Sequence, residues 1–189
     1  MTQTKIVTKK SVFEWNQLLV LSLWFVPAAV VTWGIHEFAH YATGILLGYD
    51  MWITFNHAGP VQGHFDADFH EVAVAMAGPV VTWVQAVVVL QWIRNSRKQF
   101  LYPLLFLTLW SRALAAIFSF ISHPNDEAKA SVLVGLPMWV LPALSVGLMF
   151  ATTFYGSRIL KMGWKGNTVS YIAASIVTAA IVFSDEWLF

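Results

Sequence analysis

Residues 18–47 read LLVLSLWFVPAAVVTWGIHEFAHYATGILL. A helix needs about 20 apolar residues to cross the hydrocarbon core of a bilayer, and this run is longer than that. It also contains His36, Glu37 and His40. Ionisable side chains are costly inside a membrane and mark functional positions there. The stretch therefore predicts a membrane-spanning helix with a chemical site built into it.

Four further apolar runs follow the first one. Of the 189 residues, 58% are apolar and 11% are charged, and the mean hydropathy is +0.63, whereas a soluble domain has about 25% charged residues. This composition predicts an all-α polytopic membrane protein, in which residues 1–189 form a single integral domain in the lipid bilayer. It disfavours nucleic-acid binding and cytosolic enzymology. The five expected transmembrane helices cover about residues 18–47, 72–93, 100–121, 132–155 and 168–183.

The basic residues outside these runs predict the orientation of the chain, because Lys and Arg are retained on the cytoplasmic side. Lys129 is the one Lys or Arg in the loops expected on the outer side. We therefore expect a cytoplasmic N-terminus and an extracytoplasmic C-terminus. A competing interpretation takes the N-terminus as a secretory signal peptide with a cleavage site near Val26-Pro27-Ala28. The inner loops and the N-terminus hold Lys5, Lys9, Lys10, Arg94, Arg97, Lys98, Arg158, Lys161 and Lys165.

The longest connection lies between the first two runs. Its residues 51–55, MWITF, are β-forming, residues 56–60, NHAGP, are typical of a turn, and residues 61–65, VQGHF, are a weaker return strand. We expect an interfacial β-hairpin whose free edge can add an extended substrate strand. A plain extracytoplasmic loop is the alternative.

His36-Glu37-Phe38-Ala39-His40 forms an H-E-x-x-H pattern. Residues four apart lie on one face of a helix, so both imidazoles can reach a single Zn²⁺, and Glu37 beside them can act as the general base. The chain contains no Cys, so any metal must be held by His and carboxylates. A buried polar cluster that only joins helices is the alternative interpretation.

A hydrolytic zinc site takes three protein ligands and keeps one position open for water. The two histidines lie toward the outer end of the first helix, so the third ligand must come from the same side of the membrane. Candidates in the first outer loop are His57, His64, Asp66, Asp68 and His70, and those between the third and fourth runs are His123, Asp126 and Glu127.

These features resemble the site-2 protease family of intramembrane zinc metalloproteases. The resemblance covers about residues 30–135 and rests on the H-E-x-x-H helix, on Ala77-Gly78-Pro79 in the next span and on Asp126 after the third. It implies that His36, His40 and Asp126 bind zinc and that Glu37 is the base. It further implies hydrolysis of peptide bonds in transmembrane or membrane-associated substrates, with residues 49–69 forming the hairpin that holds them.

This chain departs from the family at three points. The family has Leu-Asp-Gly around its ligand Asp, whereas this chain has Asn125-Asp126-Glu127, and it often has Asn where Thr82 stands. Well-known members also face the cytosol, whereas the charge pattern places this motif near the outer side. Ala77-Gly78-Pro79 can also be read as simple helix punctuation.

Arg112 lies within the third apolar run and needs an anion there, since an unpaired guanidinium is costly in lipid. Asp126, Glu37, a lipid phosphate or a backbone carbonyl can serve, and both a bracing and a catalytic role are open.

Two functions compete with the zinc protease. One is a non-catalytic metal-binding membrane subunit, and the other is a His-ligated membrane oxidoreductase.

Overall fold

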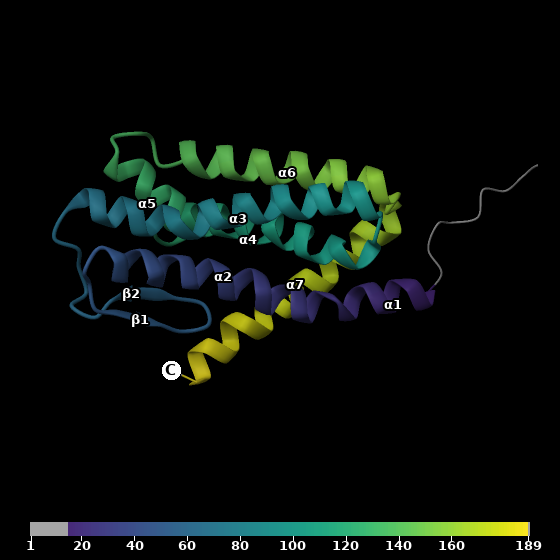
Figure 1. Ribbon diagram of the computed structural model, residues 1–189, viewed down its shortest axis with the longest axis horizontal. Coiled ribbons are helices and arrows are strands. Elements are labelled where there is room, and N and C mark those ends of the chain that lie inside the picture. The colour runs from purple at the N-terminus through teal and green to yellow at the C-terminus, as the bar shows by residue number, and fades with distance from the viewer. Residues whose placement is uncertain (1–14, 189) are drawn as a thin grey trace, which may run out of the picture.

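The computed structural model describes residues 15–188. Lys5, Lys9 and Lys10, and with them the start of the signal-peptide interpretation, lie outside this range. The expected all-α membrane fold is confirmed, with long helices lying side by side (Figure 1). The helices are α1 (Trp15–Leu23), α2 (Phe25–Leu46), α3 (Asp68–Ser96), α4 (Tyr102–Ile121), α5 (Asp126–Leu133), α6 (Val140–Leu160) and α7 (Gly163–Leu188), with a 3-10 turn, η1 (Gln99–Leu101), before α4.

Five helical segments in the described part of the chain are long and apolar enough to cross a membrane, and they bury only 28–44% of their most apolar windows. Apolar side chains such as Leu19, Val84 and Phe150 therefore point away from the protein, where lipid solvates them. The core between the helices is built from fully buried side chains that include Phe25 and Leu105. The protein is a multi-pass membrane protein.

The first span, Asn16–Leu46, runs through α1 and α2. The helix continues through their junction, because the amide of Trp24 donates to the carbonyl of Val20 and the amide of Ala28 donates to the carbonyl of Trp24. Pro27 has no N–H to donate, which leaves the carbonyl of Leu23 without its usual helical partner. One long run thus gives a single span with an irregular turn at the junction of α1 and α2.

The fourth span was predicted from residue 132, and this start is wrong. Val132 and Leu133 end the short helix α5, and α6 begins at Val140. Gly135 adopts a φ of 76°, a left-handed conformation that glycine takes without strain, and Pro137 follows it. These two residues stop α5 and start a new helix. Hydropathy alone did not separate the two, since the intervening residues are also apolar.

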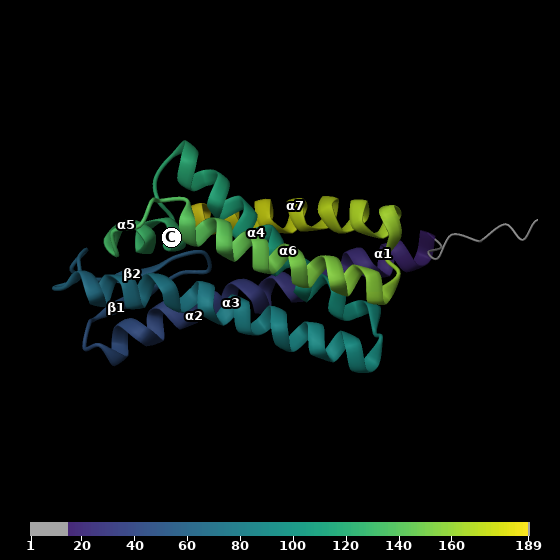
Figure 2. The same cartoon turned by 90° about the horizontal axis from the view of Figure 1, so that it is seen from above.

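The connections lie at two ends of the bundle. In Figures 1 and 2 the α3–α4 and α6–α7 connections lie toward the end where α1 begins, whereas α5 and the hairpin lie at the opposite end. The basic residues of the two connections therefore share one end. The orientation predicted from the charges requires the basic connections to lie together at one end of the bundle.

The expected hairpin is present, but its second strand was placed wrongly. β1 (Met51–Ile53) falls in the predicted first strand, whereas β2 (Ala58–Pro60) falls in the segment predicted as the turn. Trp52 pairs with Gly59, and a Cβ at Gly59 would lie 3.1 Å from the Trp52 ring. Gly59 is therefore a strand residue whose lack of a side chain admits the indole. The predicted return strand, residues 61–65, instead contains a turn at Gly63, where φ is 79°.

Two helices hold the hairpin in place. The Asn56 side-chain oxygen accepts a hydrogen bond from the indole N–H of Trp33 at 3.2 Å, which joins the tip to α2. The carboxylate of Asp185, near the end of α7, accepts hydrogen bonds from the Thr54 hydroxyl at 2.9 Å and the Phe55 amide at 3.0 Å. The hairpin is thus fixed against the same end of α2 that carries the H-E-x-x-H motif.

Candidate metal centre

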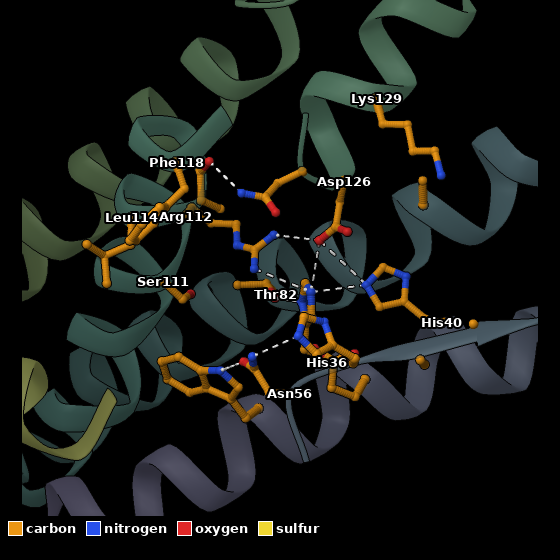
Figure 3. A pocket seen from close by; sticks show the side chains of 18 of the residues that line it. His36, His40, Asn56, Thr82, Ser111, Arg112, Leu114, Phe118, Asp126 and Lys129 are labelled. Atoms are coloured by element: carbon orange, nitrogen blue, oxygen red, sulfur yellow. Dashed lines mark hydrogen bonds and ion pairs between the residues drawn. The ribbon is translucent and has the colours of Figure 1, made fainter. Parts of the chain in front are cut away.

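The structure brings His36, His40 and Asp126 together (Figure 3). The Nε2 atom of His36 lies 3.2 Å from Asp126 Oδ2, the Nε2 atom of His40 lies 3.6 Å from the same oxygen, and the two Nε2 atoms are 3.1 Å apart. The histidines lie one turn apart on α2, and Asp126 is the first residue of α5. Three potential ligand atoms from two helices therefore face one point.

Asp126 is held there by the residue before it. The backbone amide of Asn125 donates to the Ser119 hydroxyl at 3.0 Å, and its side-chain amide donates to the carbonyl of Ala115 at 2.9 Å. Both partners belong to α4, so the start of α5 is fastened to the end of the preceding span.

The outer nitrogens of both histidines are fixed by α3. The Nδ1 atom of His40 lies 2.6 Å from the carbonyl oxygen of Val74, which can only accept. The Nδ1 atom of His36 lies 3.0 Å from Thr82 Oγ1, and this hydroxyl already donates its proton to the carbonyl of Gly78. Both Nδ1 atoms must therefore carry the hydrogen. In the neutral rings, each Nε2 atom then carries a lone pair and no hydrogen.

Two lone pairs and a carboxylate that point at one another repel unless a cation lies between them. Imidazole nitrogens and a carboxylate oxygen are ligands that zinc prefers, and a second partner on Nδ1 is the usual way in which proteins orient a ligating histidine. The donor set therefore fits a divalent metal ion, with Zn²⁺ matching its composition.

Gly78 gives the imidazoles the room they need. A Cβ at this position would overlap the rings of both His36 and His40. Ala77-Gly78-Pro79 lies well inside α3, which begins at Asp68, so the motif is more than helix punctuation. Its glycine lets the second span approach the two histidines closely.

Glu37 lies beside the cluster without belonging to it. Its side chain is 7% exposed and lines the same cavity as the histidines. Within residues 15–188, no hydrogen bond or ion pair to its carboxylate is present in the structure. A buried carboxylate that faces a cavity and has no fixed partner is available to exchange a proton with a molecule bound there.

The other candidate ligands lie away from the cluster. His70 bonds to the Tyr49 hydroxyl at 2.7 Å, His64 to the carbonyl of Gln62, and His123 to the Ser122 hydroxyl. Within the described residues, Asp66, Asp68 and His57 also belong to no group of three potential ligands. Of the candidates considered from the sequence, the structure brings only Asp126 to the histidines.

Arg112 has the anion that it needs. Its Nη1 atom lies 3.2 Å from Glu127 Oε2 and 3.3 Å from Asp126 Oδ2. Glu127 is 2% exposed and also accepts a hydrogen bond from the Ser145 hydroxyl, which in turn accepts one from the Trp83 indole. Sequence reasoning missed this role of Glu127 and those of Thr82 and Ser145. The unpaired Arg in an apolar run was the signal that a buried acid lay nearby.

The cluster opens into a cavity of about 720 Å³. Its wall combines polar groups near the histidines with apolar side chains of α4, among them Leu114 and Phe118, and with the β2 residues Ala58, Gly59 and Pro60. A cavity of this size admits several residues of an extended peptide. It joins the candidate ligands, Glu37 and the hairpin in one space.

No family model, curated protein or solved structure matches this chain.

Proposed function

We propose that this protein is a zinc-dependent intramembrane endopeptidase, similar in its chemistry to the site-2 proteases, that hydrolyses peptide bonds of transmembrane or membrane-associated substrates. The observation that carries the proposal is the convergence of His36, His40 and Asp126 beside a buried, unpaired Glu37. Zn²⁺ held by these three residues would supply a Lewis acid that polarises the scissile carbonyl and the attacking water. The open cavity next to the ligands has room for the scissile peptide bond and for the attacking water.

The protein's own residues divide the remaining work. Glu37 accepts the proton of the attacking water and delivers it to the leaving nitrogen, so that the C–N bond breaks as the amine leaves neutral. Thr82 and the carbonyl of Val74 hold the two imidazoles with their Nε2 atoms turned inward. Asp126 would offset the positive charge of the metal beside His36, His40 and Glu37, which are buried.

The hairpin provides a binding edge for substrate. β2 pairs with β1 on one side and lines the cavity, so its other edge can pair with an extended chain. An extended chain exposes its peptide bonds, whereas a transmembrane helix buries them in its own hydrogen bonds. The substrate class is therefore a segment that unwinds beside the hairpin.

The charge pattern supports a cytoplasmic N-terminus and a site that opens on the extracytoplasmic side. The site lies at the hairpin end of the bundle, opposite the basic connections (Figure 1).

A His-ligated oxidoreductase of the di-iron type needs about eight ligands. The described residues hold one group of three, which favours a mononuclear hydrolytic centre.

Replacement of the base tests this function. The purified Glu37→Gln protein should keep its zinc, measured per chain by plasma mass spectrometry, while peptide cleavage falls by about 10²–10⁴-fold, because an amide cannot accept the proton. Asp126→Ala should lose both zinc and activity, whereas Asp68→Asn, which changes an exposed carboxylate that does not line the cavity, should lose neither.

Undiminished cleavage by Glu37→Gln would refute the protease assignment. Stoichiometric zinc in a wild-type protein that cleaves no membrane-derived peptide would instead favour the non-catalytic metal-binding subunit.

A further inference from the structure

Arg112 brings a fixed positive charge to the edge of the metal centre. Its side chain is 7% exposed and projects from α4 toward the cluster (Figure 3). The Nη1 atom is shared between Asp126 and Glu127, whereas the Nη2 atom has the Nε2 lone pair of His36 as its partner, at 3.3 Å. The two ends of one guanidinium thus have different neighbours.

The partner of Nη2 is the same lone pair that a bound metal ion needs. His36 has one lone pair on Nε2, because its hydrogen is on Nδ1, held by Thr82. Zinc and the Arg112 N–H cannot both use it. When the metal binds, Nη2 loses this partner while Glu127 and Asp126 keep Nη1 in place.

The rest of the guanidinium offers no substitute. The Nε atom of Arg112 is buried and has no hydrogen-bond partner within the described residues. A buried donor without a partner is costly, and a buried charge even more so. The loaded site would therefore leave the Nη2 N–H of a cation unsatisfied directly beside the metal ligands.

We propose that Arg112 binds the oxygen of the scissile carbonyl as negative charge develops on it during hydrolysis, and that Glu127 is the positioning residue that keeps the guanidinium there. This inference rests on the proposed protease function. Water attack turns the carbonyl oxygen into an oxyanion, which reverts to a carbonyl when the C–N bond breaks, so Arg112 gains and loses no proton. Donors fixed in advance at such a position stabilise the transition state more than the substrate.

Glu127 suits the positioning role because it is anchored independently of the metal. Both of its oxygens contact Nη1 of Arg112, and Oε1 also accepts the hydrogen bond from Ser145 on α6. The acid therefore ties the guanidinium to α5 and α6 at once. Asp126 alone would not do this, since its Oδ2 atom also faces both histidines.

The test uses the full-length zinc-loaded protein in detergent, with Arg112→Lys and Glu127→Gln as variants and Arg158→Lys as the matched control at an exposed position. For each protein we would measure zinc content, kcat and KM on one peptide. We would also measure the affinities for a phosphinic peptide, which carries an anionic oxygen at the carbonyl position, and for its uncharged methylene isostere.

Arg112→Lys should keep its zinc, lower kcat by about 10²–10³-fold with little change in KM, and weaken phosphinic-peptide binding in parallel. Binding of the uncharged isostere should not change. Glu127→Gln should move the same quantities in the same direction by a smaller factor, and it carries the test if Arg112→Lys fails to fold. The control should match the wild type.

An Arg112→Lys protein with wild-type kcat, or one in which kcat falls only in proportion to a loss of zinc, would overturn the inference, because Arg112 would then do no more than brace Asp126. A wild-type protein that binds zinc and the phosphinic peptide but cleaves nothing would instead refute the protease function. In that case, the phosphinic-peptide affinities of Arg112→Lys and the wild type would still test whether Arg112 binds the anionic oxygen.

Discussion

Residues of α3 fix the orientation of the two imidazoles. Gly78 packs against both rings, while Thr82 and the carbonyl of Val74 hold their Nδ1 atoms. All three residues belong to α3, so one helix sets the direction in which α2 presents its histidines. Small changes on α3 should therefore alter the affinity of the site for a metal ion.

Gly78→Ala tests this dependence. The added methyl group overlaps both imidazoles and must push them from their positions, so the zinc affinity should fall by at least about 10–100-fold, as happens when groups behind metal ligands are altered. Competition with a chromogenic chelator measures it. Gly147→Ala, on α6, has open space around its Cβ position and should bind zinc normally. Equal affinities for the two variants would show that the rings are not confined by α3.

How much of the site the sequence predicts depends on distance along the chain. His36, Glu37 and His40 were evident because one turn of one helix brings them together. Asp126 was one of eight candidates, and the family resemblance rather than its spacing singled it out. The roles of Thr82, Val74 and Glu127 could not be assigned, because they depend on the rotation of α3 and α5 against α2, which no local pattern encodes.

At the scale of elements, the hairpin depends on α7. Asp185 accepts two hydrogen bonds from the hairpin turn, and hydrogen bonds to a charged group contribute about 1.5–3 kcal/mol each. Asp185→Ala should therefore speed amide exchange in residues 54–57 by roughly 10–100-fold, measured by hydrogen–deuterium exchange. Asp50→Ala removes an exposed carboxylate at the base of the same hairpin and should leave the rate unchanged. Slow exchange in both variants would mean that β1 and β2 hold the turn without α7.

The elements themselves were largely predictable, and the errors have local causes. Apolar run length identified the spans, since the membrane fixes how many residues a helix needs. The start of α6 was missed because Val132 and Leu133, which end α5, and the loop after them are as apolar as a span. The second strand was missed because Ala58-Gly59-Pro60 reads as a turn, whereas in the structure it pairs with β1 and the Trp52 ring lies close to Gly59.

At the scale of the whole molecule, the two ends of the bundle should face different compartments. The chain has no Cys, so single cysteines can be introduced without further changes. Gln62→Cys, in the hairpin connection, should react with a membrane-impermeant maleimide in intact cells, because the proposed orientation places the basic connections inside and the hairpin end outside. Asn95→Cys, at the end of α3, should react only after the membrane is permeabilised. The reverse pattern would place the site on the cytosolic side.

The separation of 90 positions between His36 and Asp126 has a consequence for biosynthesis. A ribosome that has delivered α2 to the membrane has supplied two of the candidate ligands and the proposed base, but the candidate third ligand emerges only after α3 and α4 have been synthesised. On the proposed function, the nascent chain therefore carries no complete metal centre while its own spans are still unpaired. Late delivery of Asp126 would delay proteolytic competence until most of the bundle is available to enclose it.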